Sequence, residues 1–167
     1  MQAGGSHRAR VHRPAEVIGD LRRHGLTVVT QPGFIADRGD DYRARVDHCD
    51  LVDLYRCRSL IDAGVPVALS SDAPYGPVDP WAVIAAAARR RTESGTVLGA
   101  PERLDPAQAL RSYLTPPNRP AGPVRRVRAG EPADLLVLDV PLRDMLDSPE
   151  SSAVRTVLVG GRIVHSR

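Results

Sequence analysis

The sequence predicts an α/β fold in which part of a parallel β/α layer is followed by a β-rich tail. Helical patterns and short β-branched runs alternate through about the first 115 residues, which is typical of a parallel sheet covered by helices. Beyond a proline-rich stretch, apolar residues recur with the spacing of short strands instead. We therefore expect an α/β part at 1–115, a connector at 116–123 and a β-rich tail at 124–167.

The first unit of the α/β part is a helix followed by a strand. Apolar residues at helical spacing begin after Pro14 and stop at Gly25, a residue type that often ends helices. Residues 26–30 then form a β-branched run typical of a buried strand. We expect Gln31 and the Pro-Gly pair after it to end this strand, and the Asp-Asp pair at 40–41 to be solvated in a loop.

The second unit repeats this order. Asp50 is a suitable cap for a single helix that continues to Gly64. A short apolar strand is expected at 65–69, and the segment Ser-Ser-Asp-Ala-Pro follows it directly at 70–74. The second unit therefore places a carboxylate just beyond a buried strand.

The remaining elements also have recognisable starts. Helices are expected at the Asp-Pro pairs 79–80 and 105–106, because Asp caps a helix and Pro suits its first position. A two-residue Gly-Gly turn at 160–161 favours a hairpin in the tail. The tail strands are expected at 135–139, 154–159 and 162–165.

Composition excludes several classes of protein. The net charge is +3, and the arginine clusters, including 89–91, are interspersed with acidic residues, so we interpret them as solvated surface arginines and expect no nucleic-acid partner. No apolar run has transmembrane length, and residues 1–14 lack the apolar core of a signal peptide, so no membrane partner is expected. Cys49 and Cys57 lie in or beside one expected helix, too far apart for a disulfide, which favours reduced thiols in a cytoplasmic protein.

Polar residues at the ends of buried strands are how a (β/α)8 barrel presents its site. A full barrel needs about 250 residues, so residues 1–115 have room for about three of its eight units. Asp72, one of these strand-end residues, can bind a divalent metal or take a proton from metal-bound water. It can equally be an ordinary capping aspartate of the loop.

Two further residues are candidates for the same site. His12 can ligate a metal, or it can be an ordinary surface or core histidine. Gln31 can hydrogen-bond a substrate, or it can satisfy loop backbone groups. A catalytic metal site generally needs three protein ligands and an open position, and these residues offer at most two of the three.

Five segments together resemble one family. They are Thr-Val-Val-Thr-Gln-Pro-Gly-Phe at 27–34, Leu-Tyr-Arg-Cys-Arg-Ser-Leu at 54–60, Val-Ala-Leu-Ser-Ser-Asp-Ala-Pro at 67–74, Gly-Glu-Pro-Ala-Asp-Leu-Leu-Val-Leu-Asp at 130–139 and Val-Leu-Val-Gly-Gly-Arg-Ile-Val at 157–164. The first three resemble the late barrel strands of the amidohydrolase superfamily, in particular the amidohydrolase 3 type that includes the N-substituted formamide deformylases. The last two resemble the return strand and closing hairpin of that superfamily, so the resemblance covers the C-terminal portion of such an enzyme.

The resemblance implies a (β/α)8 barrel with a small β-sandwich made from both chain ends. It implies that Asp72 contacts the metal and acts as base and acid on the hydrolytic water. It implies that His12 is a second metal ligand and that the cofactor is a divalent metal, zinc in the complete enzyme. The family's other metal ligands lie on barrel strands upstream of the matched segments.

Two hypotheses about function follow. In the first, the chain is part of a hydrolase that cleaves a non-peptide C–N bond of a small amide-like molecule with metal-activated water, and it is inactive alone. In the second, it is a non-catalytic remnant, or a fragment that completes its barrel with a missing N-terminal chain or with a second copy of itself. An unpaired sheet edge, which three strands must leave, motivates the second hypothesis.

Overall fold

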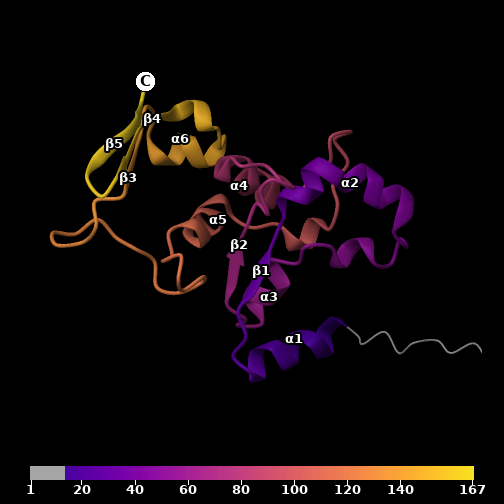
Figure 1. Ribbon diagram of the computed structural model, residues 1–167. Coiled ribbons are helices and arrows are strands. Elements are labelled where there is room, and N and C mark those ends of the chain that lie inside the picture. The colour runs from indigo at the N-terminus through magenta and orange to yellow at the C-terminus, as the bar shows by residue number, and fades with distance from the viewer. Residues whose placement is uncertain (1–13) are drawn as a thin grey trace, which may run out of the picture.

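The computed structural model describes residues 14–167 and shows a mixed α/β chain (Figure 1). The helices are α1 (Pro14–Arg23), α2 (Gly33–Arg45), α3 (Arg58–Asp62), α4 (Pro80–Arg89), α5 (Pro106–Tyr113) and α6 (Leu142–Asp147), with short 3-10 turns η1 (Leu51–Asp53), η2 (Ala100–Glu102) and η3 (Ser151–Ala153). The strands are β1 (Val28–Thr30), β2 (Val67–Leu69), β3 (Leu135–Leu138), β4 (Val154–Val159) and β5 (Arg162–Ser166). No helix among these residues is long and apolar enough to cross a membrane.

The two strands of the α/β part lie side by side and run in parallel, as expected. Val28 pairs with Val67 and Thr30 with Leu69, and the Ser70 amide extends the pairing by donating to the Thr30 carbonyl oxygen at 2.9 Å. All three residues of β2 are buried. The carboxyl ends of both strands therefore meet at one edge, where the loops after them come together.

The main core lies between β2, α4 and α5, and α4 contributes the most to it. Its buried side chains include Trp81, Val83 and Ile84. The expected caps are present: the Asp79 carboxylate accepts from the Trp81 amide at 2.9 Å, and Asp105 caps α5 in the same way. The short α6, which was not expected, packs against this core through Met145.

The tail forms an antiparallel sheet in the order β3-β4-β5 at one end of the molecule (Figure 1). Gly160 and Gly161 have φ of 55° and 78°, the left-handed values that a two-residue hairpin turn requires. The Asp134 carboxylate accepts from the Gly160 amide at 2.7 Å and from Arg125 at 2.9 Å. Asp134 thus joins the hairpin turn to Arg125, just beyond the connector.

Residues 33–45 contradict the sequence expectation, because they form helix α2 and not a loop. Asp40 is not simply solvated: its carboxylate accepts from the Ser94 amide at 2.8 Å and the Ser94 hydroxyl at 2.6 Å. These hydrogen bonds lower the pKa of Asp40 to about 2. Asp40 therefore joins α2 to the turn at 92–96, whereas Asp41 is exposed as expected.

The single helix expected from Asp50 to Gly64 is also wrong. It divides into η1 and α3, and between them Tyr55 has a left-handed φ of 48°. Cys49 and Cys57 therefore do not share a helix, although neither forms a disulfide. Two buried charged residues, Arg90 and Glu102, bind the backbone at this break.

Candidate active site at the carboxyl ends of β1 and β2

Asp72 lies in a tight turn directly after β2. Its amide donates to the Ser70 hydroxyl at 3.2 Å, and its carbonyl oxygen accepts from the amides of Tyr75 at 2.9 Å and Gly76 at 3.2 Å. The backbone of Asp72 has a φ of 55°, a value that Asp adopts more readily than most residues. Its side chain is exposed and forms no ion pair or hydrogen bond with residues 14–167. The turn thus holds a carboxylate that is available to a ligand.

Gly76 limits how this turn can move. A Cβ atom at position 76 would overlap the Ser71 carbonyl oxygen and lie 3.3 Å from the Phe34 ring. We expect Gly76→Ala to lower the free energy of unfolding by about 1–3 kcal/mol, because the crowding is against backbone. Urea denaturation measures this.

Gly19→Ala is the matched control, because Gly19 lies in α1 with open space around its Cβ position. It should raise stability by about 0.5–1 kcal/mol, since Ala is the better helix former. Equal changes in the free energy of unfolding for Gly76→Ala and Gly19→Ala would contradict the crowding that we infer at Gly76.

Gln31 lies at the same edge as Asp72, because it directly follows β1. It is half-buried, its carbonyl oxygen accepts from the Phe34 amide at 3.1 Å at the start of α2, and its side chain has no hydrogen bond to the described residues. The parallel pairing of β1 with β2 brings the Gln31 and Asp72 segments to one end of the sheet. His12 lies outside the described residues.

The sequence patterns did not predict the aromatic layer that lies beside the Asp72 turn. The Tyr55 ring lies 5.6 Å from Phe34 and 6.0 Å from Tyr42, centre to centre, and the two tyrosine hydroxyl groups are 2.7 Å apart. The Arg38 guanidinium stacks 4.5 Å above the Phe34 ring and donates to the Tyr75 carbonyl oxygen at 2.9 Å. This layer connects the Asp72 turn to α2 and to the break between η1 and α3.

The hydroxyl group of Tyr55 remains neutral at physiological pH. Its pKa is raised, first by burial, then by the hydrogen bond between its hydroxyl group and that of Tyr42, and by nearby charge, to which Asp72 contributes. Two hydroxyl groups that share one hydrogen bond leave one O–H proton free to be donated elsewhere. The Tyr55–Tyr42 pair therefore keeps one hydroxyl proton that is not used between the two rings.

Arg90 explains why the helix is broken at Tyr55. Its side chain is 0% exposed, and it donates to the carbonyl oxygens of Leu54 at 2.7 Å, Tyr55 at 3.0 Å and Leu98 at 2.7 Å. Burial lowers its pKa. The interpretation of 89–91 as surface arginines is therefore wrong for Arg90, because three backbone carbonyl groups replace its water.

Glu102 holds the other side of the same break. One of its carboxylate oxygens accepts from the Cys57 amide at 2.9 Å and the Ser59 amide at 3.0 Å. Burial raises the pKa of Glu102, but the hydrogen bonds from Ser59 and Cys57 and the charge of Arg56 outweigh it, and the pKa is lowered. Burial also raises the pKa of the Cys57 thiol to about 12, so Cys57 is no nucleophile at neutral pH. We call Arg90 and Glu102 the backbone clamp.

The described residues do not form a complete metal centre. Residues 14–167 contain no group of three His, Cys, Asp or Glu side chains close enough to hold one ion. Asp72 is a suitable oxygen ligand on its own, whereas a catalytic site needs about three protein ligands. The described residues can therefore supply only some of the ligands that a catalytic metal site needs.

Comparison with known proteins places the chain in a family. A model of the Amidohydrolase family matches residues 2–165. The N-substituted formamide deformylase of Arthrobacter pascens is 34% identical over 127 residues, which cover 74% of this chain and 23% of that protein. An uncharacterized metal-dependent hydrolase from Pyrococcus horikoshii OT3 superposes with a TM-score of 0.51 at 28% identity, over 60% of this chain and 21% of that one. The chain thus spans less than a quarter of either relative's length, and it belongs to the amidohydrolase family, amidohydrolase 3 type.

Proposed function

We propose that this chain contributes the Asp72 edge of the active site of a metal-dependent hydrolase that cleaves a non-peptide C–N bond. The observation that carries the proposal is the Asp72 carboxylate at the carboxyl end of β2, which has no partner among the residues that the structure describes. Membership of the amidohydrolase family supports it, as does the likeness to a metal-dependent hydrolase. By analogy with the formamide deformylase, we propose a small amide or formamide as the substrate.

Each candidate residue has a role in this proposal. An Oδ atom of Asp72 takes the proton of the attacking water and returns it to the leaving nitrogen. Gln31 orients the substrate carbonyl with its side-chain amide, and His12 and Asp72 hold the metal. A divalent ion, which we propose is zinc, lowers the pKa of bound water and polarises a carbonyl group. Since the described part holds only a share of the ligands, we propose that these residues are inactive without the rest of a barrel.

A second candidate function is supported by the exposed apolar side chains of both sheets. Val29 in the two-stranded sheet is 48% exposed, and Ile163 and Val164 in β5 are 66% and 61% exposed. Small parallel sheets are rarely stable with open edges. A non-catalytic segment that completes its sheets with another polypeptide, or with a second copy, would cover these residues. A folded monomer in size-exclusion chromatography would argue against this candidate, and a stable dimer or aggregation would favour it.

The hydrolase proposal is tested by complementation. The chain is assayed for zinc by equilibrium dialysis and for hydrolysis of formanilide, an N-substituted formamide, alone and with a polypeptide encoded in the DNA just upstream. We expect neither stoichiometric zinc nor turnover with the chain alone. We expect both in the complemented protein, with turnover lowered about a thousandfold by Asp72→Asn, because proton transfer is lost.

Asp47→Asn is the control, since Asp47 is exposed and its carboxylate has no partner in the described residues. It should leave turnover unchanged. Full turnover of the Asp72→Asn protein after complementation would overturn the role of Asp72. Tight stoichiometric zinc and formanilide hydrolysis by the chain alone would overturn the need for a further polypeptide.

A further inference from the structure

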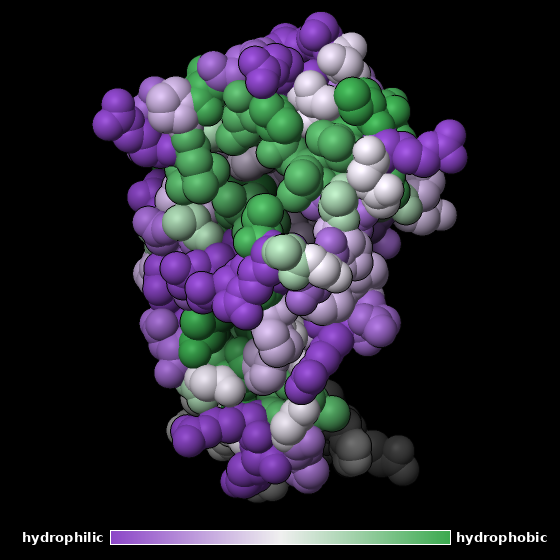
Figure 2. Space-filling view, turned by 90° about the vertical axis from the view of Figure 1, so that its left-hand side faces the viewer, coloured by the Kyte–Doolittle hydropathy of each residue, from purple (hydrophilic) through white to green (hydrophobic). Residues whose placement is uncertain are grey.

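A hollow with apolar walls opens on the tail side of the molecule. Figure 2 shows hydrophobic residues gathered around it, with hydrophilic residues along the borders of this face. The hollow corresponds to a cavity of about 540 Å³ between α4, α5, the segment at 125–134 and β3. Its lining contains no residue of the Asp72 turn, so it is separate from the proposed active site.

The floor and walls of the cavity are made of large apolar side chains. They are Trp81 at the start of α4, Leu110 of α5, Leu135 and Leu138 of β3, and Leu142 of α6. Leu142 is 52% exposed, so its side chain offers apolar surface to a molecule in the cavity. A volume of this size is ordinary for a site that encloses a small molecule.

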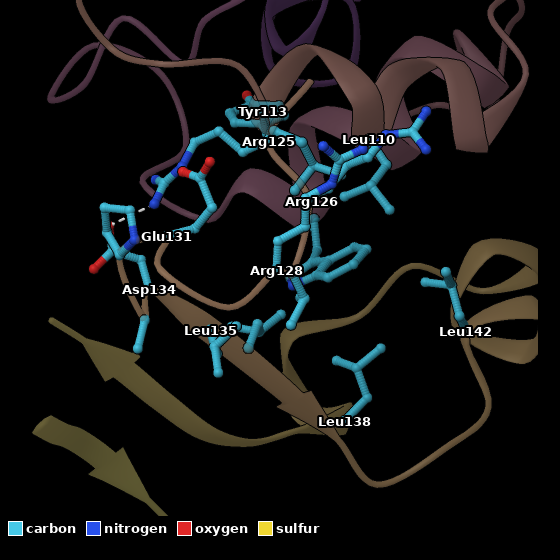
Figure 3. A pocket seen from close by; sticks show the side chains of 16 residues that line it. Leu110, Tyr113, Arg125, Arg126, Arg128, Glu131, Asp134, Leu135, Leu138 and Leu142 are labelled. Carbon is cyan, nitrogen blue, oxygen red and sulfur yellow. Dashed lines mark hydrogen bonds and ion pairs between the residues drawn. The ribbon is translucent and has the colours of Figure 1, made fainter. Parts of the chain in front are cut away.

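The segment at 125–131, between the connector and β3, places charge at one side of the cavity (Figure 3). Arg125 is neutralised by Asp134, with 2.9 Å between nitrogen and oxygen. Arg126 and Arg128 also line the cavity and are exposed, and their guanidinium groups have no ion pair or hydrogen bond with the side chains that the structure describes. Glu131 offsets one of these two charges, so the lining retains a net positive charge beside an apolar floor.

We propose that this cavity binds a free amphiphilic carboxylate with a single acyl chain of about eight to ten carbons. The chain lies against the leucines and Trp81, and the carboxylate accepts from Arg126 and Arg128, whose guanidinium geometry suits it. Each methylene group that is buried strengthens binding about fourfold. A neutral ligand gains nothing from the arginines, and a short anion gains nothing from the floor.

The test uses the single tryptophan of the chain as a reporter. Trp81 lines the cavity, and the sequence has no other tryptophan. Decanoate, decanol and butyrate are titrated into the purified protein while tryptophan emission and binding heat are recorded. We expect decanoate to bind with a change in emission, decanol to bind at least tenfold more weakly, and butyrate not to bind.

A double substitution distinguishes binding by the two cavity arginines from a general effect of the protein's positive charge. The double variant Arg126→Gln/Arg128→Gln should bind decanoate at least tenfold more weakly and bind decanol with unchanged affinity. The control Arg22→Gln/Arg45→Gln removes the same charge from exposed positions on α1 and α2, and should leave both ligands unchanged. Equal binding of decanoate and decanol, an equal loss in the control, binding to anionic vesicles without binding of free decanoate, or no binding at all would each overturn the proposal.

Discussion

Arg90→Met is expected to lower the free energy of unfolding by about 3–5 kcal/mol, because it removes a buried charge with its hydrogen bonds. The apolar side chain fills most of the space but leaves the carbonyl oxygens of Leu54, Tyr55 and Leu98 without their donor. This is a large part of the 5–15 kcal/mol that stabilises a typical domain. Urea denaturation followed by circular dichroism measures the loss.

Two further variants isolate the clamp function of Arg90. Arg90→Lys should be nearly as destabilising, because an ammonium group lacks the planar fork that reaches three carbonyl groups. Arg89→Ala removes an exposed neighbouring arginine at the end of α4 and should change stability by no more than about 0.5 kcal/mol. Similar stability of all three variants would mean that the carbonyl groups find other donors.

Glu102→Ala is expected to lower the free energy of unfolding by about 2–3 kcal/mol, because the buried Cys57 and Ser59 amides lose a charged acceptor. The effect depends on pH. The pKa of Glu102 in the folded chain lies below its ordinary value of 4.5, so ionised Glu102 stabilises the fold above pH 4.5. That contribution is lost as the pH falls through the lowered pKa.

Glu102→Gln provides the pH-dependent comparison. It keeps one acceptor oxygen but cannot ionise, so its stability should fall less steeply than that of the natural chain below pH 4.5. Glu93→Ala, at an exposed glutamate of the 92–96 turn, should behave like the natural chain at every pH. Parallel pH curves for the natural and Glu102→Gln proteins would exclude Glu102 as the ionising group.

Most of the fold was predictable where local sequence decides it. The caps at Asp79 and Asp105 and the Gly160–Gly161 turn follow from nearby residues, and the alternation of helices and strands predicts that the two short strands run in parallel. Helix α2 was not predictable in this way, since it begins with Pro-Gly and buries few residues, mainly Phe34 and Ile35. Its place depends on contacts with α4 and with the turn at 92–96.

Of the candidate site, only the residues at the strand ends could be predicted from the sequence. Gln31 follows a short β-branched run and Asp72 a short apolar one, a local pattern that the structure places at one edge. Tyr55 could not be recognised, because propensity favours a continuous helix through it. Only the long-range hydrogen bonds of Arg90 and Glu102, across 35 to 45 residues, favour the break. No pattern along the chain distinguishes these two residues from surface charges.

The backbone clamp constrains the order in which segments of the chain can fold during synthesis. The segment from Leu54 to Ser59 is complete only when the side chains of Arg90 and Glu102 reach it, and the ribosome adds Glu102 45 residues after Cys57. Until then the Tyr55 backbone lacks its partners and is free to remain helical. Folding during synthesis therefore cannot complete the segment from Leu54 to Ser59 before η2 has emerged.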